Sequence, residues 1–264
     1  MSSYQTIEIE RTGAIALVTL NRPDSLNAFD TQMRREFIKA AREVNNDDDI
    51  RVVVLTGSGR AFSAGADLAE KVPPEDAGGQ AVEDFLNFEY KTGMLAVKDA
   101  NKPWISAVNG AAAGIGSAYA MVCDLVIMAD DAYLYQAFAA IGLVPDGGAT
   151  WHLARILGRQ RAYELIVSGE KLRAERCAEL GLCNRVVPAG ELVEQAIAQA
   201  EMLTTKAPLA LRYAKESLNY ALEHSLDEVI SNEARLQHLC IDSDDSKEGA
   251  VAFLQKRKPE FKGR

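Results

Sequence analysis

The main-chain amides of residues 103–124 are the groups in this sequence best suited to chemistry. An apolar run, Trp104–Val108, precedes a turn made almost wholly of alanine and glycine, residues 111–116, and then a small-residue helix. A strand, a glycine-rich turn and a helix N-terminus leave backbone N–H groups free to face a ligand. Residues 103–124 contain no Lys, Arg or His, so N–H groups would have to stabilise any anion bound there. This favours a transient oxyanion over a stored phosphate charge.

A second small-residue turn follows the apolar strand predicted over residues 52–56. It is formed by residues 61–68, Ala-Phe-Ser-Ala-Gly-Ala-Asp-Leu. Two such turns on adjacent strands could each offer one N–H to a single carbonyl oxygen. Tight helix–strand packing without a ligand would give the same composition, and the spacing leaves both interpretations open.

Repeated strand–turn–helix units in the first half of the chain would position these turns. Alternating residues predict a hairpin over 6–10 and 14–20. Asp30 or Thr31 can cap a helix with an apolar face. A buried strand over 51–56, a surface loop over 71–79, a helix over 81–97 and strands over 124–129 and 132–135 follow.

Helical patterns dominate after Gly147, where only residues 184–187 are typical of a strand. The predicted helices span residues 149–157, 160–168, 173–179, 191–204, 208–223, 226–241 and 246–255. These helices need a surface to cover, either the core of the same chain or a symmetry mate.

Composition narrows the function classes. The 264 residues are 48% hydrophobic, enough for one large domain, and the net charge of −9 argues against nucleic acid or an anionic membrane as partner. The N-terminus has no signal-peptide pattern, and polar residues interrupt the longest apolar run, so no membrane span is predicted. The four cysteines form no CxxC pair and the three histidines lack zinc spacing, which predicts reduced thiols, no metal and a cytoplasmic location.

In combination, several segments resemble the enoyl-CoA hydratase/isomerase (crotonase) superfamily over nearly the whole chain. They are residues 20–23 (LNRP), 26–28 (LNA), 61–68, 107–114 (AVNGAAAG), 142–148 (GLVPDGG) and the basic tail that contains Phe261. The resemblance implies an α/β fold, a spiral of ββα units over residues 1–200. It also implies a C-terminal helical trimerisation region over 201–264, and trimers or hexamers.

The resemblance further implies an acyl-CoA thioester as substrate, with coenzyme A carried on the substrate and no separate cofactor. Two backbone N–H groups would bind the thioester oxygen, and the matching positions are Ala64 and Ile115. Ile115 replaces a usual glycine, which narrows the pocket. The implied substrate-binding residues are Ala28, Ala66, Asp67, Leu68, Gly114, Lys258 and Phe261, the last two closing over the nucleotide.

One departure from the family pattern bears on the reaction. Hydratases of this family hold two glutamates that activate water, and the matching positions here are Ala118 and Phe138. Neither side chain can transfer a proton, so water addition by two carboxylates at those positions is not supported.

Asp146, in the segment Pro145-Asp146-Gly147, is the remaining carboxylate that could reach an acyl chain. An Asp before a helix is a good N-cap, which would lower its pKa. Burial beside Ile115 and Phe138 would instead raise the pKa toward that of a useful base. Isomerase-like branches of the family often have an acid here, but the sequence does not decide between cap and base.

The leading interpretation is an isomerase that moves a double bond from the 3- to the 2-position of an enoyl-CoA, or rearranges a ring-CoA, with Asp146 as acid and base. A second is a hydratase using Asp146 alone or Glu70, Glu83 or Glu89. A third is an acyl-CoA-binding oligomer without catalysis. A branch with a nucleophilic Asp and a preceding histidine is disfavoured because the first histidine is His152. The three histidines are expected on helix surfaces or at caps, and Tyr119, Tyr135 and Gln136 as pocket liners or core residues.

Overall fold

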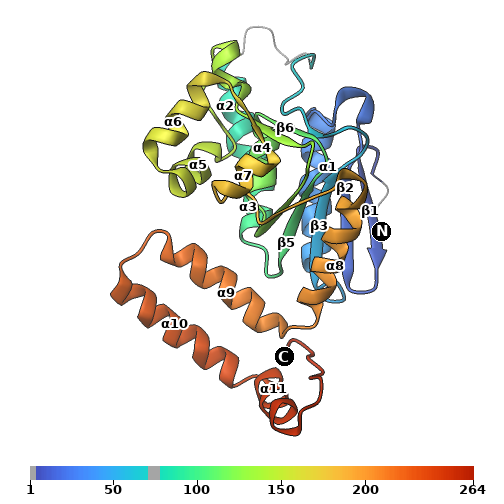
Figure 1. The fold of residues 1–264 in the computed structure, drawn as a ribbon, viewed down its shortest axis with the longest axis vertical. Helices are drawn as coiled ribbons and strands as arrows, with labels where there is room; N and C mark the ends of the chain where they lie inside the picture. Colours follow the sequence, from blue (N-terminus) through green and yellow to red (C-terminus); the bar gives the residue numbers. More distant parts are fainter. Residues whose placement is uncertain (1–3, 71–77) are drawn as a thin grey trace.

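The computed structural model describes residues 4–70 and 78–264 and is built around two sheets (Figure 1). Their strand orders are β1-β2-β3-β5-β7-β10 and β4-β6-β8-β9. The first sheet comprises β1 Ile7–Thr12, β2 Ile15–Leu20, β3 Val52–Gly57, β5 Trp104–Val108, β7 Leu125–Ala129 and β10 Arg185–Val187. The second comprises β4 Ala61–Ser63, β6 Ala111–Ala113, β8 Tyr133–Tyr135 and β9 Lys171–Arg173.

Helices cover both sheets and form the C-terminal end. They are α1 Thr31–Asn46, α2 Gly78–Asp84, α3 Lys91–Lys98, α4 Ile115–Met121, α5 Ala149–Leu157, α6 Arg159–Ser168, α7 Ala174–Glu179, α8 Leu192–Thr204, α9 Pro208–Ala221, α10 Leu226–Ile241 and α11 Asp244–Gln255. A π-helix, Phe85–Tyr90, joins α2 to α3, and short 3-10 turns cover Pro23–Ser25, Ala137–Ile141 and Ala189–Glu191.

A ββα unit repeats along the chain. The consecutive pairs β3/β4, β5/β6 and β7/β8 each give one strand to each sheet before helices follow. In the first sheet, β3, β5 and β7 run parallel to one another, and in the second sheet β4, β6 and β8 do the same. In each sheet the carboxyl ends of these strands therefore lie at the same edge. The predicted α/β spiral is confirmed, as is the antiparallel hairpin of β1 and β2.

The packing of α1 confirms the helix predicted from sequence. The N–H of Met33 donates to the carboxylate of Asp30 at 2.8 Å, so Asp30 is the cap. The apolar residues Met33, Phe37, Ala40, Ala41 and Val44 are all buried against the first sheet. One face of α1 therefore closes the core over β1 and β2, and Phe37 lies near Trp104 of β5, with ring centroids 6.4 Å apart.

Some expectations needed correction. The helix predicted over residues 81–97 is interrupted by the π-helix, a local widening that is frequent at functional sites. The three-residue strands β4, β6 and β9 were not predicted, because so short a run has no readable periodicity. Most of the loop expected over 71–79 lies outside the described residues.

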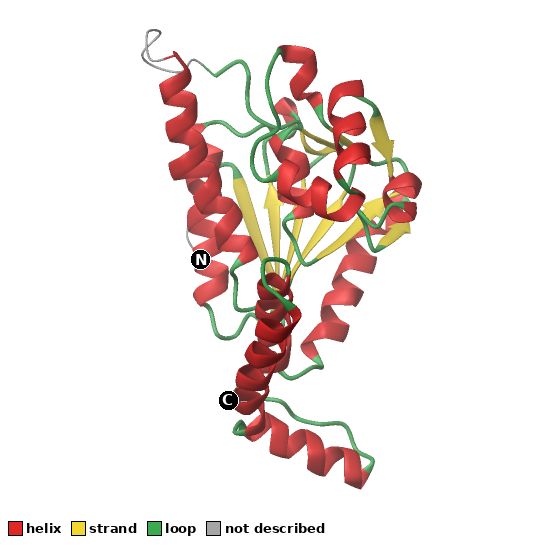
Figure 2. Ribbon diagram, turned by 90° about the vertical axis from the view of Figure 1, so that its left-hand side faces the viewer, coloured by secondary structure: helices red, strands yellow, loops and turns green. Residues whose placement is uncertain are grey.

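The last three helices extend beyond the end of the first sheet that is remote from β6 and α4 (Figures 1 and 2). α8 still packs on that sheet, with Leu192, Ala196 and Ala200 in the core. The predicted division at residue 200 therefore falls inside α8, and as a domain boundary it stays a prediction. Lys215 of α9 holds the first of these helices to the core by an ion pair with Asp124 at 2.8 Å.

Candidate active site

The two predicted turns lie against each other beyond the ends of β4 and β6. A Cβ added to Gly65 would be 2.8 Å from the carbonyl oxygen of Ala113, and one added to Gly116 would be 2.6 Å from that of Ser63. Real side chains do not tolerate such distances, so glycine is what lets the backbones approach. The pairing of Ala61 with Ala111 sets this register.

Not every N–H group of the first turn is free for a ligand. The N–H of Ala64 donates to the carbonyl of Leu26 at 2.8 Å, so the expectation that Ala64 serves a ligand is wrong. Phe29 then pairs with the turn through Phe29 N–H to Gly65 O at 2.7 Å and Asp67 N–H to Phe29 O at 3.1 Å. The N–H of Ala66, between these bonds, has no acceptor among the described residues.

The second turn leaves the N–H of Ile115 unpaired. Gly114 donates its own N–H to Tyr135 O at 2.9 Å and adopts φ +52°, a conformation that favours glycine. Ile115 is the first residue of α4, so its N–H has no partner within the helix, and the described residues offer no other acceptor. Among the described residues, the N–H groups of Ala66 and Ile115 therefore lack an acceptor, one on each of two adjoining turns, as do those of Leu68 and Gly116 at the ends of the same turns.

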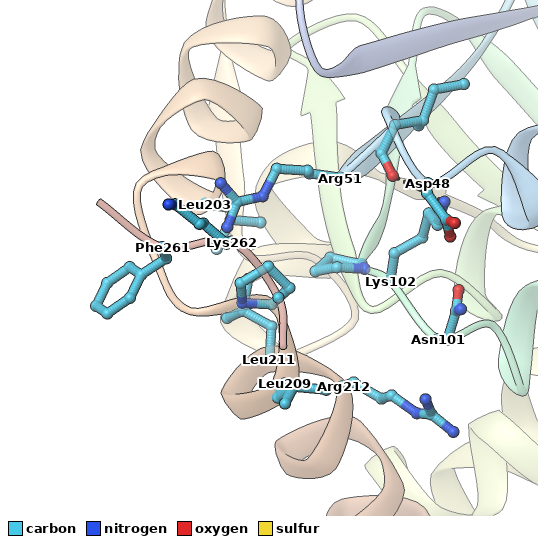
Figure 3. A pocket seen from close by; sticks show the side chains of 14 residues that line it. Asp48, Arg51, Asn101, Lys102, Leu203, Leu209, Leu211, Arg212, Phe261 and Lys262 are labelled. Atoms are coloured by element: carbon cyan, nitrogen blue, oxygen red, sulfur yellow. Dashed lines mark hydrogen bonds between the residues drawn. The ribbon is translucent and has the colours of Figure 1, made fainter. Parts of the chain in front are cut away.

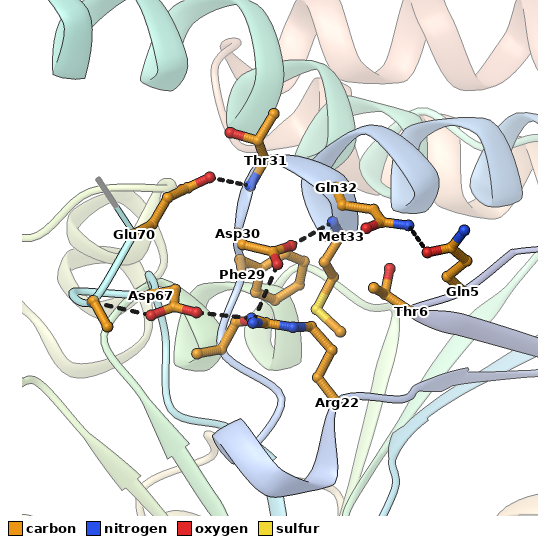
Figure 4. Close-up of polar contacts among 12 residues, drawn as sticks. Gln5, Thr6, Arg22, Phe29, Asp30, Thr31, Gln32, Met33, Asp67 and Glu70 are labelled. Atoms are coloured by element: carbon orange, nitrogen blue, oxygen red, sulfur yellow. Dashed lines mark hydrogen bonds and ion pairs between the residues drawn. The ribbon is translucent and has the colours of Figure 1, made fainter. Parts of the chain in front are cut away.

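Arg22 links the first turn to the segment that precedes α1. Its guanidinium contacts Asp30 at 3.1 Å and Asp67 at 3.0 Å, and it donates to the carbonyl of Ala28 (Figure 4). The N–H of Ala69 donates to the other carboxylate oxygen of Asp67 at 3.0 Å. The Asp67 side chain is therefore held within the protein by Arg22 and the N–H of Ala69.

Asp146 does not cap α5. The N-cap is Gly148 and no side chain accepts a hydrogen bond from the first turn of the helix. One carboxylate oxygen of Asp146, Oδ1, is buried and has no partner among the described residues. Burial raises the pKa of Asp146 to about 6. A base that titrates near neutral pH is suited to proton transfer.

A largely apolar cavity of about 550 Å³ adjoins Asp146. It is lined by Leu86, Lys91, Met94, Leu95, Lys98, Val122, Val144, Pro145, Asp146, Gly147, Gly148, Trp151 and His152. Burial, together with the charges of Lys98 and Arg155, lowers the pKa of His152 to about 4, so its ring is neutral. His152 thus lines the cavity rather than the outer helix surface. This cavity could not be predicted from the sequence, because residues 86–98 show no readable pattern.

Two of the alternative carboxylates, Glu70 and Glu89, are held by arginine, and Glu83 is exposed. Burial would raise the pKa of Glu70, but hydrogen bonds from Thr31 and Arg34 outweigh it and lower the pKa. Glu89 is paired with Arg34 and with Arg35, the latter at 3.1 Å. Glu70 and Glu89 are engaged by arginine and Glu83 is exposed, which leaves the buried, unpartnered Asp146 as the better candidate.

The remaining predicted residues divide into two groups. Ala28 is buried beside the first turn and Leu68 is exposed at its end. Lys258 and Phe261 belong to the tail, and Phe261 packs on Gly249 at the amino end of β3, near Arg51 and Lys102 (Figure 3).

The strand β3 separates that place from the turns at its carboxyl end. The expectation that Lys258 and Phe261 close over the site is therefore wrong for a single chain. The tail is anchored by Asp245, whose carboxylate accepts the N–H groups of Lys262 and Gly263 at 2.6 and 2.7 Å.

Comparison with known proteins shows the family to which the chain belongs. The family model described as enoyl-CoA hydratase/isomerase matches residues 10–264. The chain belongs to the enoyl-CoA hydratase/isomerase family. It is 38% identical over 259 residues to a probable enoyl-CoA hydratase of Mycobacterium bovis, covering 98% of each chain. It is also 38% identical over 254 residues to the 1,2-epoxyphenylacetyl-CoA isomerase of Escherichia coli, covering 95% of each.

The crystal structure of an enoyl-CoA hydratase from Bacillus anthracis superposes with a TM-score of 0.91 at 33% identity, covering 98% of this chain and 100% of that one. As a member of the enoyl-CoA hydratase/isomerase family the protein is an enzyme. Among the described residues, His, Cys, Asp and Glu form no group of three that could hold a metal ion. Over the same residues, no helix has the length and hydropathy of a membrane span.

Proposed function

We propose that this enzyme isomerises an enoyl-CoA, moving the double bond from the 3- to the 2-position or rearranging a ring-CoA, with Asp146 as the single acid and base. The observation that supports this most is the buried, unpartnered Oδ1 of Asp146 at the wall of an apolar cavity. Coenzyme A is part of the substrate, and the proposed reaction needs no further cofactor.

The proposed chemistry uses one carboxylate and no water. Ionised Asp146 removes a proton from C2 of the 3-enoyl thioester, and the electron pair moves onto the thioester oxygen and across the adjacent double bond. The protonated Asp146 then returns the same proton to C4 as the double bond forms between C2 and C3. One proton leaves and one returns, so the reaction is balanced and needs no outside reagent.

The N–H groups of Ala66 and Ile115 would hold the charged oxygen between these two steps. Ala66 replaces Ala64 in this role because the N–H of Ala64 is already bonded to Leu26. Donors fixed by the fold stabilise developing charge without reorganising during the reaction. Main-chain donors also place no demand on the side chain, so Ile115 can stand where the family usually has glycine.

Hydration is the second candidate, because several relatives are named as probable enoyl-CoA hydratases. The two positions that hold glutamates in hydratases are Ala118, fully buried, and Phe138, which contacts Gly114. Asp146 alone would then have to activate water, without a second carboxylate to position it. The arrangement therefore favours isomerisation.

A turnover screen separates the two reactions. Purified enzyme is given 3-hexenoyl-CoA and, separately, 2-hexenoyl-CoA. Isomerisation makes the conjugated-thioester absorbance appear from the first, whereas hydration makes it disappear from the second. Rapid loss of absorbance from 2-hexenoyl-CoA with no gain from 3-hexenoyl-CoA would overturn the proposal in favour of a hydratase.

The nucleotide part of the substrate would bind along the first turn, at the main chain of Ala28, Ala66, Asp67 and Leu68, with Gly114 facing the thioester. We also propose a homotrimer or hexamer. The tail with Lys258 and Phe261 lies far from the turns of its own chain, so a second copy would have to supply any contact from it. The proposed location is the cytoplasm.

A further inference from the structure

A buried polar chain leads from the side chain of Gln136 to the peptide group that precedes Ile115. The Nε2 of Gln136 donates to Ser117 Oγ at 2.9 Å, and Ser117 Oγ donates to the carbonyl oxygen of Gly114 at 2.6 Å. Gln136 is 1% exposed and Ser117 is 0% exposed. The Gly114 carbonyl and the Ile115 N–H belong to one planar peptide group, so holding the first orients the second.

The hydrogen-bond directions follow from proton counting. Ser117 has one hydroxyl proton, and the 2.6 Å contact with a carbonyl oxygen requires it there. Ser117 Oγ can then only accept from Gln136, which presents its NH₂ group and turns Oε1 away. Gln136 Oε1 is indeed buried without a partner among the described residues. Gln136 Oε1 is thus left without a donor, while the NH₂ group of Gln136 stays bonded to Ser117 Oγ.

The same peptide group is fixed at several other points. Gly114 donates its own N–H to the carbonyl of Tyr135, the residue before Gln136, at 2.9 Å. The Gly114 carbonyl accepts a second hydrogen bond from the N–H of Ser117 at 3.0 Å. A carbonyl that accepts two hydrogen bonds is polarised, and in a low-dielectric interior such chains strengthen each other. The N–H at the far end of the peptide, on Ile115, becomes a better donor.

We infer that Ser117 and Gln136 are positioning residues, which orient and polarise the Gly114–Ile115 peptide toward the thioester oxygen without touching the substrate. This inference rests on the proposed oxyanion role of the Ile115 N–H. It does not depend on whether the reaction is isomerisation or hydration, since both pass through charge on the thioester oxygen.

Two variants and one matched control test the inference. Ser117→Ala removes the hydroxyl, and Gln136→Leu removes the amide together with its unsatisfied oxygen. Ser106→Ala is the control, because Ser106 is also fully buried and donates to a main-chain carbonyl of α4, that of Ala120, at 2.9 Å. A purely structural role predicts that Ser106→Ala and Ser117→Ala behave alike, and that Gln136→Leu is neutral or stabilising.

The readout is the polarisation of a bound carbonyl. Hexanoyl-CoA labelled with ¹³C at the thioester carbon has no double bond to move, and isotope-edited infrared difference spectra report its carbonyl stretch. Binding to the unmodified enzyme and to Ser106→Ala should lower the stretching frequency. Ser117→Ala and Gln136→Leu should lose much of that shift. With an enoyl-CoA that the enzyme converts, the kcat of both variants should fall about tenfold at nearly constant KM. This fall is smaller than the one expected when a group that binds the oxyanion directly is removed.

The outcomes separate the two claims. A frequency shift in the unmodified enzyme that persists in both variants, with kcat unchanged, would overturn the positioning role and leave the oxyanion hole standing. No shift in the unmodified enzyme would overturn the oxyanion hole itself. Thermal melts of each variant show whether any loss arises from unfolding, and Ser117→Ala, the smaller change, decides the matter if Gln136→Leu does not fold.

Discussion

Gly147 lies directly against the side chain of Ile115. A Cβ added to Gly147 would be 2.6 Å from Cγ1 and 3.0 Å from Cδ1 of Ile115. The residue next to the proposed base is therefore packed on the residue whose N–H is proposed to hold the oxyanion. The contact joins the two segments that carry the groups needed at the same time in the proposed reaction.

Gly147→Ala should therefore reduce activity sharply. The new methyl group would overlap the Ile115 side chain, so either that side chain or the segment that holds Asp146 has to shift, and both carry groups of the proposed site. Displacement of a catalytic group by about 1 Å can cost on the order of 100-fold in rate. The measurement is kcat/KM on 3-hexenoyl-CoA, with the melting temperature recorded in parallel.

Gly148→Ala is the control for that substitution. Gly147 and Gly148 both have positive φ, +60° and +86°, so alanine strains the backbone at either position. The nearest atom to a Cβ on Gly148 is 4.0 Å away, on His152, so no clash arises there. Equal losses of activity in the two variants would show that strain, rather than the contact with Ile115, is responsible.

Activity should depend on the ionisation of Asp146. Burial raises its pKa from 3.8 to about 6, and the base must be ionised to remove a proton. The value of kcat/KM should therefore rise with pH through about 6 and then become constant. Asp146→Glu should shift the midpoint of this pH profile. If the midpoint arose from the phosphates of coenzyme A instead, the substitution would leave it unchanged. A profile that is flat down to pH 5 would argue against this base.

The same raised pKa predicts a gain in stability for Asp146→Asn. A carboxyl group whose pKa is raised on folding contributes stability below its unfolded pKa of 3.8, and loses that contribution as the pH rises through about 6. At pH 8 the ionised, half-buried Asp146 therefore destabilises the fold, by about 1–2 kcal/mol after allowance for solvent screening.

Urea unfolding of the Asp146→Asn variant and the unmodified enzyme at pH 4.5 and pH 8 measures this effect. The gain in the free energy of unfolding of the Asn variant should be larger at pH 8 than at pH 4.5, because Asp146 is ionised at pH 8. Other titrating groups are the same in both proteins and cancel in the comparison. If Asp146 capped a helix, the Asn variant would be no more stable than the unmodified enzyme at pH 8.

Gly65→Ala should separate the two turns. Its Cβ would lie 2.8 Å from Ala113 O, so the backbone approach that places Ala66 near Ile115 would be lost. Binding of hexanoyl-CoA, measured by calorimetry, should weaken at least tenfold. Gly13→Ala also has positive φ but no neighbouring atom within 4 Å, and should leave binding unchanged. Unchanged binding in Gly65→Ala would contradict the proposed convergence of the turns.

Much of the fold was predictable because its long elements have clear periodicity. The hairpin, α1 with its Asp30 cap, the strands β3 and β5 and the C-terminal helices α5 and α10 match the sequence pattern. The short strands β4 and β6 were not predictable, since three small residues have no period. They nevertheless bring the two turns together, through contacts between backbones that only the folded chain reveals.

The sequence was enough to predict the segments of the candidate site, but not every residue in them. The sequence identified both glycine-rich turns and Asp146. It could not show that the N–H of Ala64 is taken by Leu26, because that bond joins two segments far apart in the chain. Nor could it decide between cap and base at Asp146. The choice depends on the positive φ of Gly147 and Gly148, because Gly148 becomes the N-cap of α5 and no side chain caps the helix.

The rate of 3-hexenoyl-CoA isomerisation by Asp146→Asn tests the central claim most directly. Asn has nearly the shape of Asp but cannot accept the proton from C2. The account predicts a loss of at least about 100-fold in kcat, with hexanoyl-CoA binding within a few-fold of the unmodified enzyme. An Asp146→Asn variant that still converts 3-hexenoyl-CoA at the original rate would contradict it.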